Sequence, residues 1–166
     1  MGLMTNIRIK HILLMQKTLD ALGNVLKYVT PQQASTMTDE TNGWTILEVL
    51  CHLRDTDEIY LRECERILER NYPILTSYDY NALALERQYT SQNLTQVYVD
   101  LVKSRRLLIE FFEALKDDHW NRAGLHPDHG HFTLTDALVY IAHHDIEHLE
   151  QITRILAETY YINSTA

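Results

Sequence analysis

Hydrophobic residues recur at intervals of three and four along most of the chain, the spacing that places them on one face of an α-helix. Four segments show this pattern, at roughly residues 6–28, 46–70, 94–116 and 134–160. No stretch shows the alternation of apolar and polar residues that a half-buried strand would give. Four long helices of similar length are typical of a four-helix bundle. We therefore predict an all-α fold, with a single domain over residues 1–166.

Three of these helices begin at recognisable capping sequences. Thr45 is followed three residues later by Glu48, which is the pattern of a capping box, in which each side chain bonds the other residue's backbone N–H. Asn93 and Thr133 are residue types that favour the position before the first helical turn, and each precedes an apolar periodic segment. These signals predict the starts of the second, third and fourth helices.

The connection between the second and third helices is unusually long. Residues 71–92 contain no long periodic segment, and we expect one short helix there, around residues 81–87. A connection of this length inside a compact domain is usually functional, for example as the cover of a site. A plain surface crossover is the other interpretation, and the sequence leaves both open.

Composition narrows the class of protein. With 166 residues, of which 45% are hydrophobic, the chain can bury a core without a disulfide or a structural metal. Its 5 glycines and 3 prolines are too few for an all-β domain with many turns. No apolar run approaches the roughly 20 residues of a membrane-spanning helix, so we predict no membrane partner.

Charge and cysteine content bear on partners and on location. The formal net charge of −8 repels phosphate backbones and predicts that nucleic acid is not a partner. Cys51 and Cys64 lie on the same predicted helix, which separates them by roughly 20 Å and precludes a disulfide between them. Unpaired thiols are typical of a reducing compartment, so we predict a cytoplasmic protein.

The most informative residues are two histidines of the fourth helix. His144 and His148 are four residues apart, which places their Cβ atoms about 5–6 Å from each other on one face. Two imidazoles so placed can converge on one metal ion at about 2.1 Å each. Gln151 continues the same line, whereas His143 is rotated by about 100° toward solvent and serves as an internal control. Two helix-edge histidines without a metal are the alternative.

A third candidate ligand lies on the second helix. His52 comes one turn after the capping box, at the edge of the apolar face, and Asp55 follows it by three residues. Three imidazoles would leave a divalent ion with at least one open position, as in catalytic zinc sites. Nickel, zinc and iron all accept imidazole, so these ligands alone do not select the metal. A core-edge histidine that is only hydrogen-bonded is the other interpretation of His52.

Two other metal-site patterns fit less well. A di-metal carboxylate bundle needs two Glu-x-x-His pairs, and only Asp145 with His148 comes close to one. Residues 144–148 also match the H-x-x-E-H pattern of the inverted zinc proteases. That class takes a further ligand from an acidic residue far downstream, and here only Glu150 and Glu158 follow. We therefore give both patterns little weight.

Two segments resemble the DinB/YfiT superfamily. They are Trp44–Tyr60, WTILEVLCHLRDTDEIY, and His126–Ile155, HPDHGHFTLTDALVYIAHHDIEHLEQITRI. The single histidine of CHLRDTD and the run HDIEHLEQI carry the resemblance, in matching order and spacing. The resemblance implies an up-down-down-up four-helix bundle, usually dimeric, with a metal site between helices. Its ligands would be His52, His144 and His148.

The resemblance also implies a range of chemistry. Asp55 and Gln151 match polar neighbours of the ligands in that family. Members bind nickel or zinc, and their activities include S-transfer and isomerisation with low-molecular-weight thiols and metal-dependent hydrolysis. The family name refers to damage-inducible expression and does not imply DNA repair.

We expect from this a metal-dependent enzyme that activates a low-molecular-weight thiol or water to attack a small-molecule substrate. Asp55, Glu147 and Gln151 are candidates for a base or for orienting a ligand imidazole. Glu147 lies about 100° from His148, so an ordinary surface carboxylate is the better interpretation of this residue. The basic residues that could clamp the carboxylates of a thiol cofactor are Arg54, Arg62 and Arg87.

The alternative function is a non-catalytic stress-response module, a homodimer that binds a metal or a small ligand without turnover. His126, His129 and His131 lie in the predicted loop before the fourth helix. They are candidates for the rim of a site, or are ordinary solvated residues. Cys51 is better explained by core packing than as a nucleophile beside His52, because adjacent residues on a helix diverge by about 100°.

Overall fold

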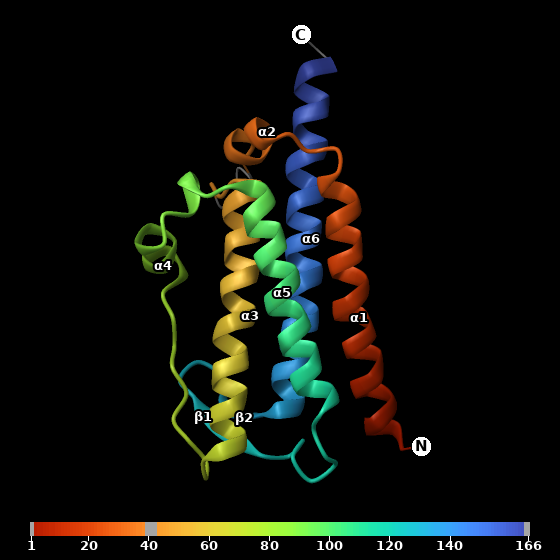
Figure 1. Ribbon diagram of the computed structural model, residues 1–166, viewed down its shortest axis with the longest axis vertical. Helices are drawn as coiled ribbons and strands as arrows, with labels where there is room; N and C mark the ends of the chain where they lie inside the picture. The colour runs from red at the N-terminus through yellow and green to blue at the C-terminus, as the bar shows by residue number, and fades with distance from the viewer. Residues whose placement is uncertain (1, 39–42, 165–166) are drawn as a thin grey trace.

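A computed structural model describes residues 2–38 and 43–164 of the protein, with side chains as far as residue 158. Its four long helices are α1 (Leu3–Leu26), α3 (Ile46–Glu69), α5 (Leu94–Glu113) and α6 (Leu134–Ser164). These helices run side by side, α1 and α6 in one direction and α3 and α5 in the other (Figure 1). The predicted four-helix bundle with up-down-down-up topology is confirmed.

Smaller elements lie at the two ends of the bundle and along α3. They are α2 (Pro31–Thr36), α4 (Tyr80–Glu86), the 3-10 turn η1 (Tyr89–Ser91), and the strands β1 (Ala123–His126) and β2 (Gly130–Thr133). Figure 1 shows α4 on the outer side of α3 and the strand pair at the end of the bundle where α6 begins. The short helix expected in the long connection is therefore present.

Capping side chains determine where the long helices begin. The Thr45 hydroxyl accepts a hydrogen bond from the backbone N–H of Glu48 at 3.2 Å, and the Glu48 carboxylate accepts one from the N–H of Thr45 at 2.8 Å. Thr133 and Asp136 form the same reciprocal pair before α6. The Asn93 side chain caps α5. A cap of this kind contributes about 1 kcal/mol to helix stability.

Two elements differ from the sequence-based expectation. The sequence showed no strand pattern, whereas in the structure β1 and β2 form a short antiparallel pair. Each strand has only four residues, too few for an alternating pattern to stand out. Helix α2 was also missed, although Thr30 and Gln33 form a capping box and Pro31 occupies the first helical position.

The core lies between the four long helices and consists of two clusters of buried apolar residues. Helix α3 contributes to both clusters, and between Ile46 and Tyr60 every residue except Glu48 and Glu58 is buried. Because α3 is covered almost all round, its polar residues in this stretch must find partners inside the protein. Across residues 2–38 and 43–164, no helix combines the length and the apolar character that a membrane span needs.

The strand pair is hydrogen-bonded to the long connection at Leu125, and the two segments approach most closely at the neighbouring Gly124. The N–H of Leu125 donates to the carbonyl of Pro73 at 2.8 Å, and the N–H of Leu75 donates to the carbonyl of Leu125 at 2.9 Å. A Cβ atom on Gly124 would lie 2.7 Å from the Pro73 carbonyl oxygen and 3.0 Å from the Leu75 side chain. Only glycine therefore allows the connection to approach this closely.

We expect Gly124→Ala to lower the free energy of unfolding by roughly 1–3 kcal/mol, because backbone atoms must move to accept the methyl group. Urea denaturation measures this directly. The matched control is Gly23→Ala, where the new Cβ would meet only the hydroxyl end of the half-buried Tyr98, which can move. Equal losses in the two variants would contradict the role of the close approach.

Candidate metal centre

Three histidines from two helices meet inside the bundle. His52 comes from α3, and His144 and His148 come from successive turns of α6. The Nε2 atom of His144 lies 2.9 Å from Nε2 of His52 and 3.1 Å from Nε2 of His148. Ligand nitrogens from all three residues lie within 4.8 Å of one another. Among the residues that the structure describes, this is the one group of three or more His, Cys, Asp or Glu side chains arranged to hold a metal ion.

The neighbouring histidine lies elsewhere, as its position on the helix predicts. His143 is exposed, and its ring packs against that of His11 on α1, with ring centroids 5.8 Å apart. The spacing of four residues therefore selects His144 and His148, which face α3. This makes His143 a suitable control for experiments on the other two.

The Nε2 atoms of the three rings cannot all be satisfied by hydrogen bonds to one another, and a bound cation would satisfy them. Nδ1 of His148 donates to the side-chain amide oxygen Oε1 of Gln151 at 2.7 Å, so Nε2 of His148 presents its lone pair to the other two rings. His144 cannot satisfy both neighbours through one Nε2 atom, which either donates or accepts. Two imidazole nitrogens that bind a tetrahedral ion stand about 3.4 Å apart. Small ring movements from the observed separations would therefore admit an ion.

Burial keeps the three rings neutral. It lowers the pKa of His52 to about 3, with repulsion from His148 as a smaller cause. Burial, with repulsion from His148 and His52, lowers the pKa of His144 to about 2. The pKa of His148 is also lowered by burial, against the effect of its hydrogen bond to Gln151. Because metal ligation requires the neutral imidazole, the site is ready to bind an ion at neutral pH without releasing protons.

These shifts predict how the stability of the metal-free protein depends on pH. Between the ordinary histidine pKa of about 6.5 and the lowered folded values, the unfolded chain binds protons that the folded chain does not. Stability is therefore complete above pH 6.5 and is lost as the pH falls below it. For His52 and His144 together we expect a loss of roughly 3 kcal/mol between pH 7.5 and pH 5.5.

Urea denaturation in the presence of a chelator, at the two pH values, tests this expectation. In His144→Leu the pH-dependent loss should shrink by about 1 kcal/mol, since one of the two groups is gone. His143→Leu should leave the loss unchanged, because His143 is exposed. An equal loss in wild type and His144→Leu would show that His144 is not held neutral.

Of the three polar residues considered as partners of the ligands, the structure brings Gln151 into contact with an imidazole. Asp55 is fully buried, but its carboxylate accepts from the Tyr89 hydroxyl at 2.5 Å and pairs with Arg54 and Arg87 at 2.8 and 2.7 Å. No described hydrogen bond of Asp55 goes to a histidine. Glu147 is exposed on α6. Asp55 thus attaches the long connection to α3 instead of orienting His52.

Aromatic side chains that the sequence did not single out surround the imidazoles. Tyr80 and Trp44 pack edge-on against His52, with ring centroids 4.5 and 5.1 Å apart. Tyr140 stacks on His144, with centroids 5.9 Å apart. Tyr80 belongs to α4, so the long connection covers the histidines, which was one of its two interpretations. These rings limit the access of water to the site.

A buried ionic cluster lies next to the histidines and joins all four long helices. Arg105 donates to both carboxylate oxygens of Asp145, one of them at 2.7 Å, and to Asp57 at 2.8 Å. The Thr18 hydroxyl also donates to Asp145, at 3.1 Å. Asp145 lies on α6 between His144 and His148. The cluster therefore fixes the helix that carries two of the three histidines. The signal in the sequence was a charged residue, Arg105, on the apolar face of the third helix.

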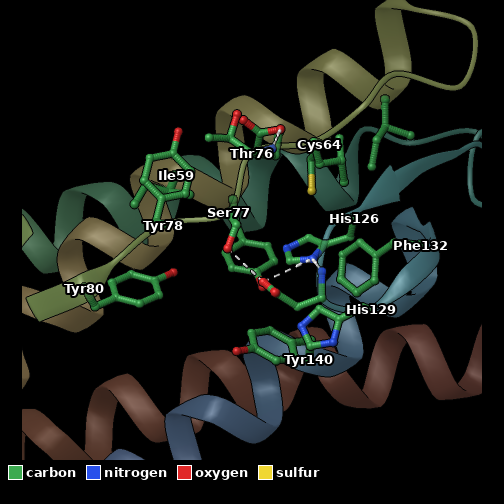
Figure 2. Close-up of a pocket in the computed structure, with 15 residues that line it drawn as sticks. Ile59, Cys64, Thr76, Ser77, Tyr78, Tyr80, His126, His129, Phe132 and Tyr140 are labelled. Atoms are coloured by element: carbon green, nitrogen blue, oxygen red, sulfur yellow. Dashed lines mark hydrogen bonds and ion pairs between the residues drawn. The ribbon is translucent and has the colours of Figure 1, made fainter. Parts of the chain in front are cut away.

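The three histidines of the predicted loop before α6 belong to the strand pair and its turn. His131 is exposed and stacks on Tyr72, with centroids 5.7 Å apart. His126 and His129 line a pocket that opens between the strand pair, α3 and the long connection (Figure 2). Both cysteines are free and buried, as expected.

Comparisons with known proteins bear on the fold and on the family. A family model described as the DinB superfamily matches residues 14–152. Among solved structures, YfiT from Bacillus subtilis is described as a probable metal-dependent hydrolase with an unusual four-helix bundle topology. It superposes with a TM-score of 0.82 and 23% sequence identity, over 92% of this chain and 87% of that chain.

Two further structures are similar in fold at lower identity. The colibactin self-resistance protein ClbS, solved in complex with double-stranded DNA, has a TM-score of 0.67 and 13% identity, over 90% of this chain and 95% of its own. The four-helix bundle protein TT2238 has a TM-score of 0.60 and 21% identity, over 90% and 98% of the two chains. No curated protein matches the sequence significantly.

Proposed function

The chain belongs to the DinB superfamily, and from this membership and its three convergent imidazoles we propose that it is a metal-dependent enzyme. In this proposal His52, His144 and His148 hold a divalent transition metal ion. The observation that carries it is the meeting of three neutral imidazoles at their Nε2 atoms, 2.9 and 3.1 Å apart. Three protein ligands leave an ion with at least one open position, which is typical of catalytic sites.

An ion in this position supplies Lewis acidity, which lowers the pKa of water or of a thiol. The protein's own residues set the conditions for this chemistry. Gln151 holds His148 with its proton on Nδ1 and its Nε2 lone pair facing inward. Trp44 and Tyr80 fix the ring of His52 by edge-on packing and exclude water from one side of the site.

We favour hydrolysis of a small-molecule substrate over thiol transfer. YfiT, which shares this fold over most of its length, is described as a probable metal-dependent hydrolase. A thiol cofactor with carboxylates would need free cationic groups nearby. Arg54 and Arg87 are engaged by Asp55, and Arg62 is exposed on α3. Activation of a low-molecular-weight thiol for S-transfer is therefore the alternative reaction of the same centre.

A donor set made only of imidazoles suits zinc and nickel. We propose one of these two as the ion. Three nitrogen ligands do not distinguish between them, so the metal recovered with the protein and the metal that supports activity must both be measured.

The test uses protein stripped with a chelator and reloaded with zinc or nickel. Hydrolysis of a panel of small esters and amides should rise at least about a hundredfold over the metal-free protein, and it should be absent in His52→Ala and retained in His143→Ala. In parallel, cobalt-loaded protein is mixed with cysteine or dithiothreitol. A new sulfur-to-metal charge-transfer band without any hydrolysis would favour thiol transfer. The absence of both signals would overturn the proposal of an enzyme and would support a non-catalytic binding module.

We further propose a homodimer that acts on a small molecule in the cytoplasm and does not bind nucleic acid. The dimer is supported by the family and by exposed apolar residues such as Leu13 and Val102. The free thiols of Cys51 and Cys64 support a reducing compartment. The net charge of −8 opposes binding to DNA, which ClbS contacts in its crystal structure. Light scattering and a DNA mobility-shift assay test the two partner proposals.

A further inference from the structure

A pocket of about 70 Å³ lies between α3, the segment 75–80, the strand pair and α6. Tyr80 and Tyr140 line it, and the same two rings pack against His52 and His144. The pocket therefore adjoins the candidate metal centre, with tyrosine rings between them. A cavity of about 150 Å³ accommodates benzene, so this one suits a group of a few heavy atoms.

The charged side chains that line the pocket are both acidic. They are Glu63 and Asp128, and its lining contains no lysine or arginine. Glu63 is already paired with Arg66 at 2.9 Å, so its charge is offset. Asp128 accepts a hydrogen bond from the Ser77 hydroxyl at 2.9 Å, and its side chain is 63% exposed. One uncompensated carboxylate thus stands at the opening of the pocket.

Two of the remaining polar side chains, His126 and Tyr60, add no positive charge at neutral pH. Nδ1 of His126 accepts the backbone N–H of Asp128 at 3.1 Å, which places the proton of the neutral ring on Nε2. Burial and the nearby His129 lower the pKa of His126, so the ring stays neutral. Burial raises the pKa of Tyr60 far above its ordinary value, so its hydroxyl stays protonated.

The walls also favour a cation over an anion. Figure 2 shows Tyr80 and the strand-pair residues His126 and Phe132 on opposite sides of the pocket. Aromatic rings attract cations through their negative faces, and more strongly where water is excluded. An anion would meet Asp128 without any counter-charge. The whole chain, at −8, adds a field of the same sign.

We propose that this pocket binds the ammonium group of a small amine, with the Asp128 carboxylate as its counter-ion. The ammonium group lies between Asp128 and the aromatic walls, and the rest of the molecule extends past Tyr80 and Tyr140 toward the three imidazoles. Small amines are then the substrate class of the metal centre. This last step rests on the proposed function, whereas the binding step requires no metal.

Three probes with the same stem separate the possible ligand classes: butylammonium, butanol and butyrate. Each is titrated into chelator-treated, isotope-labelled protein at low salt, and amide chemical shifts are followed by NMR. Butylammonium should bind about tenfold more tightly than either of the others, with shifts centred on residues 75–80 and 126–132. Asp128→Asn should weaken its binding about threefold. Asp118→Asn, an acid that is 82% exposed and lies outside the pocket, should not.

Butyrate or butanol binding as tightly as butylammonium, or unchanged affinity in Asp128→Asn, would overturn the proposal. Because the titration uses metal-free protein, a failure of the proposed metal centre leaves its outcome intact. The substrate step has its own readout on metal-loaded protein. An ester with an amino group should show a lower KM than its uncharged analogue, and Asp128→Asn should remove this difference in KM. Equal KM values in the wild type would overturn that step.

Discussion

Replacing His144 by alanine is expected to reduce bound transition metal from about one ion per chain to less than about a tenth of that. The Nε2 atom of His144 stands between the other two, so its loss removes a ligand and also separates the remaining pair. A ligand of a three- or four-coordinate site contributes about 3–4 kcal/mol, which corresponds to a loss of affinity of roughly a hundredfold to a thousandfold. Elemental analysis and competition with a chelator measure the two quantities.

The adjacent residue supplies the control for this experiment. His143→Ala should keep its metal and its affinity, because His143 faces away from the site and is exposed. Circular dichroism of both variants, without metal, checks that the bundle is intact. If the two alanine variants retain the same amount of metal, His144 is not a ligand and the three-histidine site is wrong.

The second large effect is expected at the buried ionic cluster. Arg105→Leu should lower the free energy of unfolding by about 3–5 kcal/mol, because two buried carboxylates lose their common counter-charge. Asp57 and Asp145 are each exposed by 1% only, so water cannot replace the guanidinium. Urea denaturation of the metal-free protein measures the loss, which is a large share of the stability of a domain of this size.

Here too the chain offers a matched neighbour. Arg106 follows Arg105 on α5, but its side chain is 68% exposed and its pairing with Glu110 is long, at 3.5 Å. Arg106→Leu should change stability by less than about 0.5 kcal/mol. In the Arg105→Leu background, Asp57→Asn should recover part of the loss by removing one of the unpaired charges. A small effect of Arg105→Leu, similar to that of Arg106→Leu, would contradict the structural role of the cluster.

The bundle was accessible from the sequence because its information is local. Spacings of three and four residues mark each long helix, and Thr45, Asn93 and Thr133 mark the starts of three of them. The two short strands could not be predicted from such local patterns. The four-residue strands are stabilised by pairing with each other and, through Leu125, with residues 73–75, contacts that no local pattern reports.

In the candidate site, too, local spacing could be read from the sequence, whereas contacts between distant segments could not. The spacing of His144 and His148 places them on one face of one helix. His52 was a candidate from its place on another helix, and the family resemblance assigned it to the same site. Partners in three dimensions were harder to foresee. Asp55 follows His52 by one turn, yet its carboxylate is bound by its neighbour Arg54 and by Arg87 and Tyr89 of the long connection. Tyr80 reaches His52 through a connection with no periodicity.

The most direct test of the central claim is X-ray absorption spectroscopy of the protein loaded with zinc or nickel. We predict three imidazole nitrogens at about 2.0–2.1 Å from the ion, together with at least one further light-atom ligand that exchanges with added anions. His143→Ala should give the same spectrum, and His52→Ala should lose one imidazole. A sulfur ligand, or fewer than three imidazoles in the wild type, would contradict the assignment of His52, His144 and His148 as the metal site.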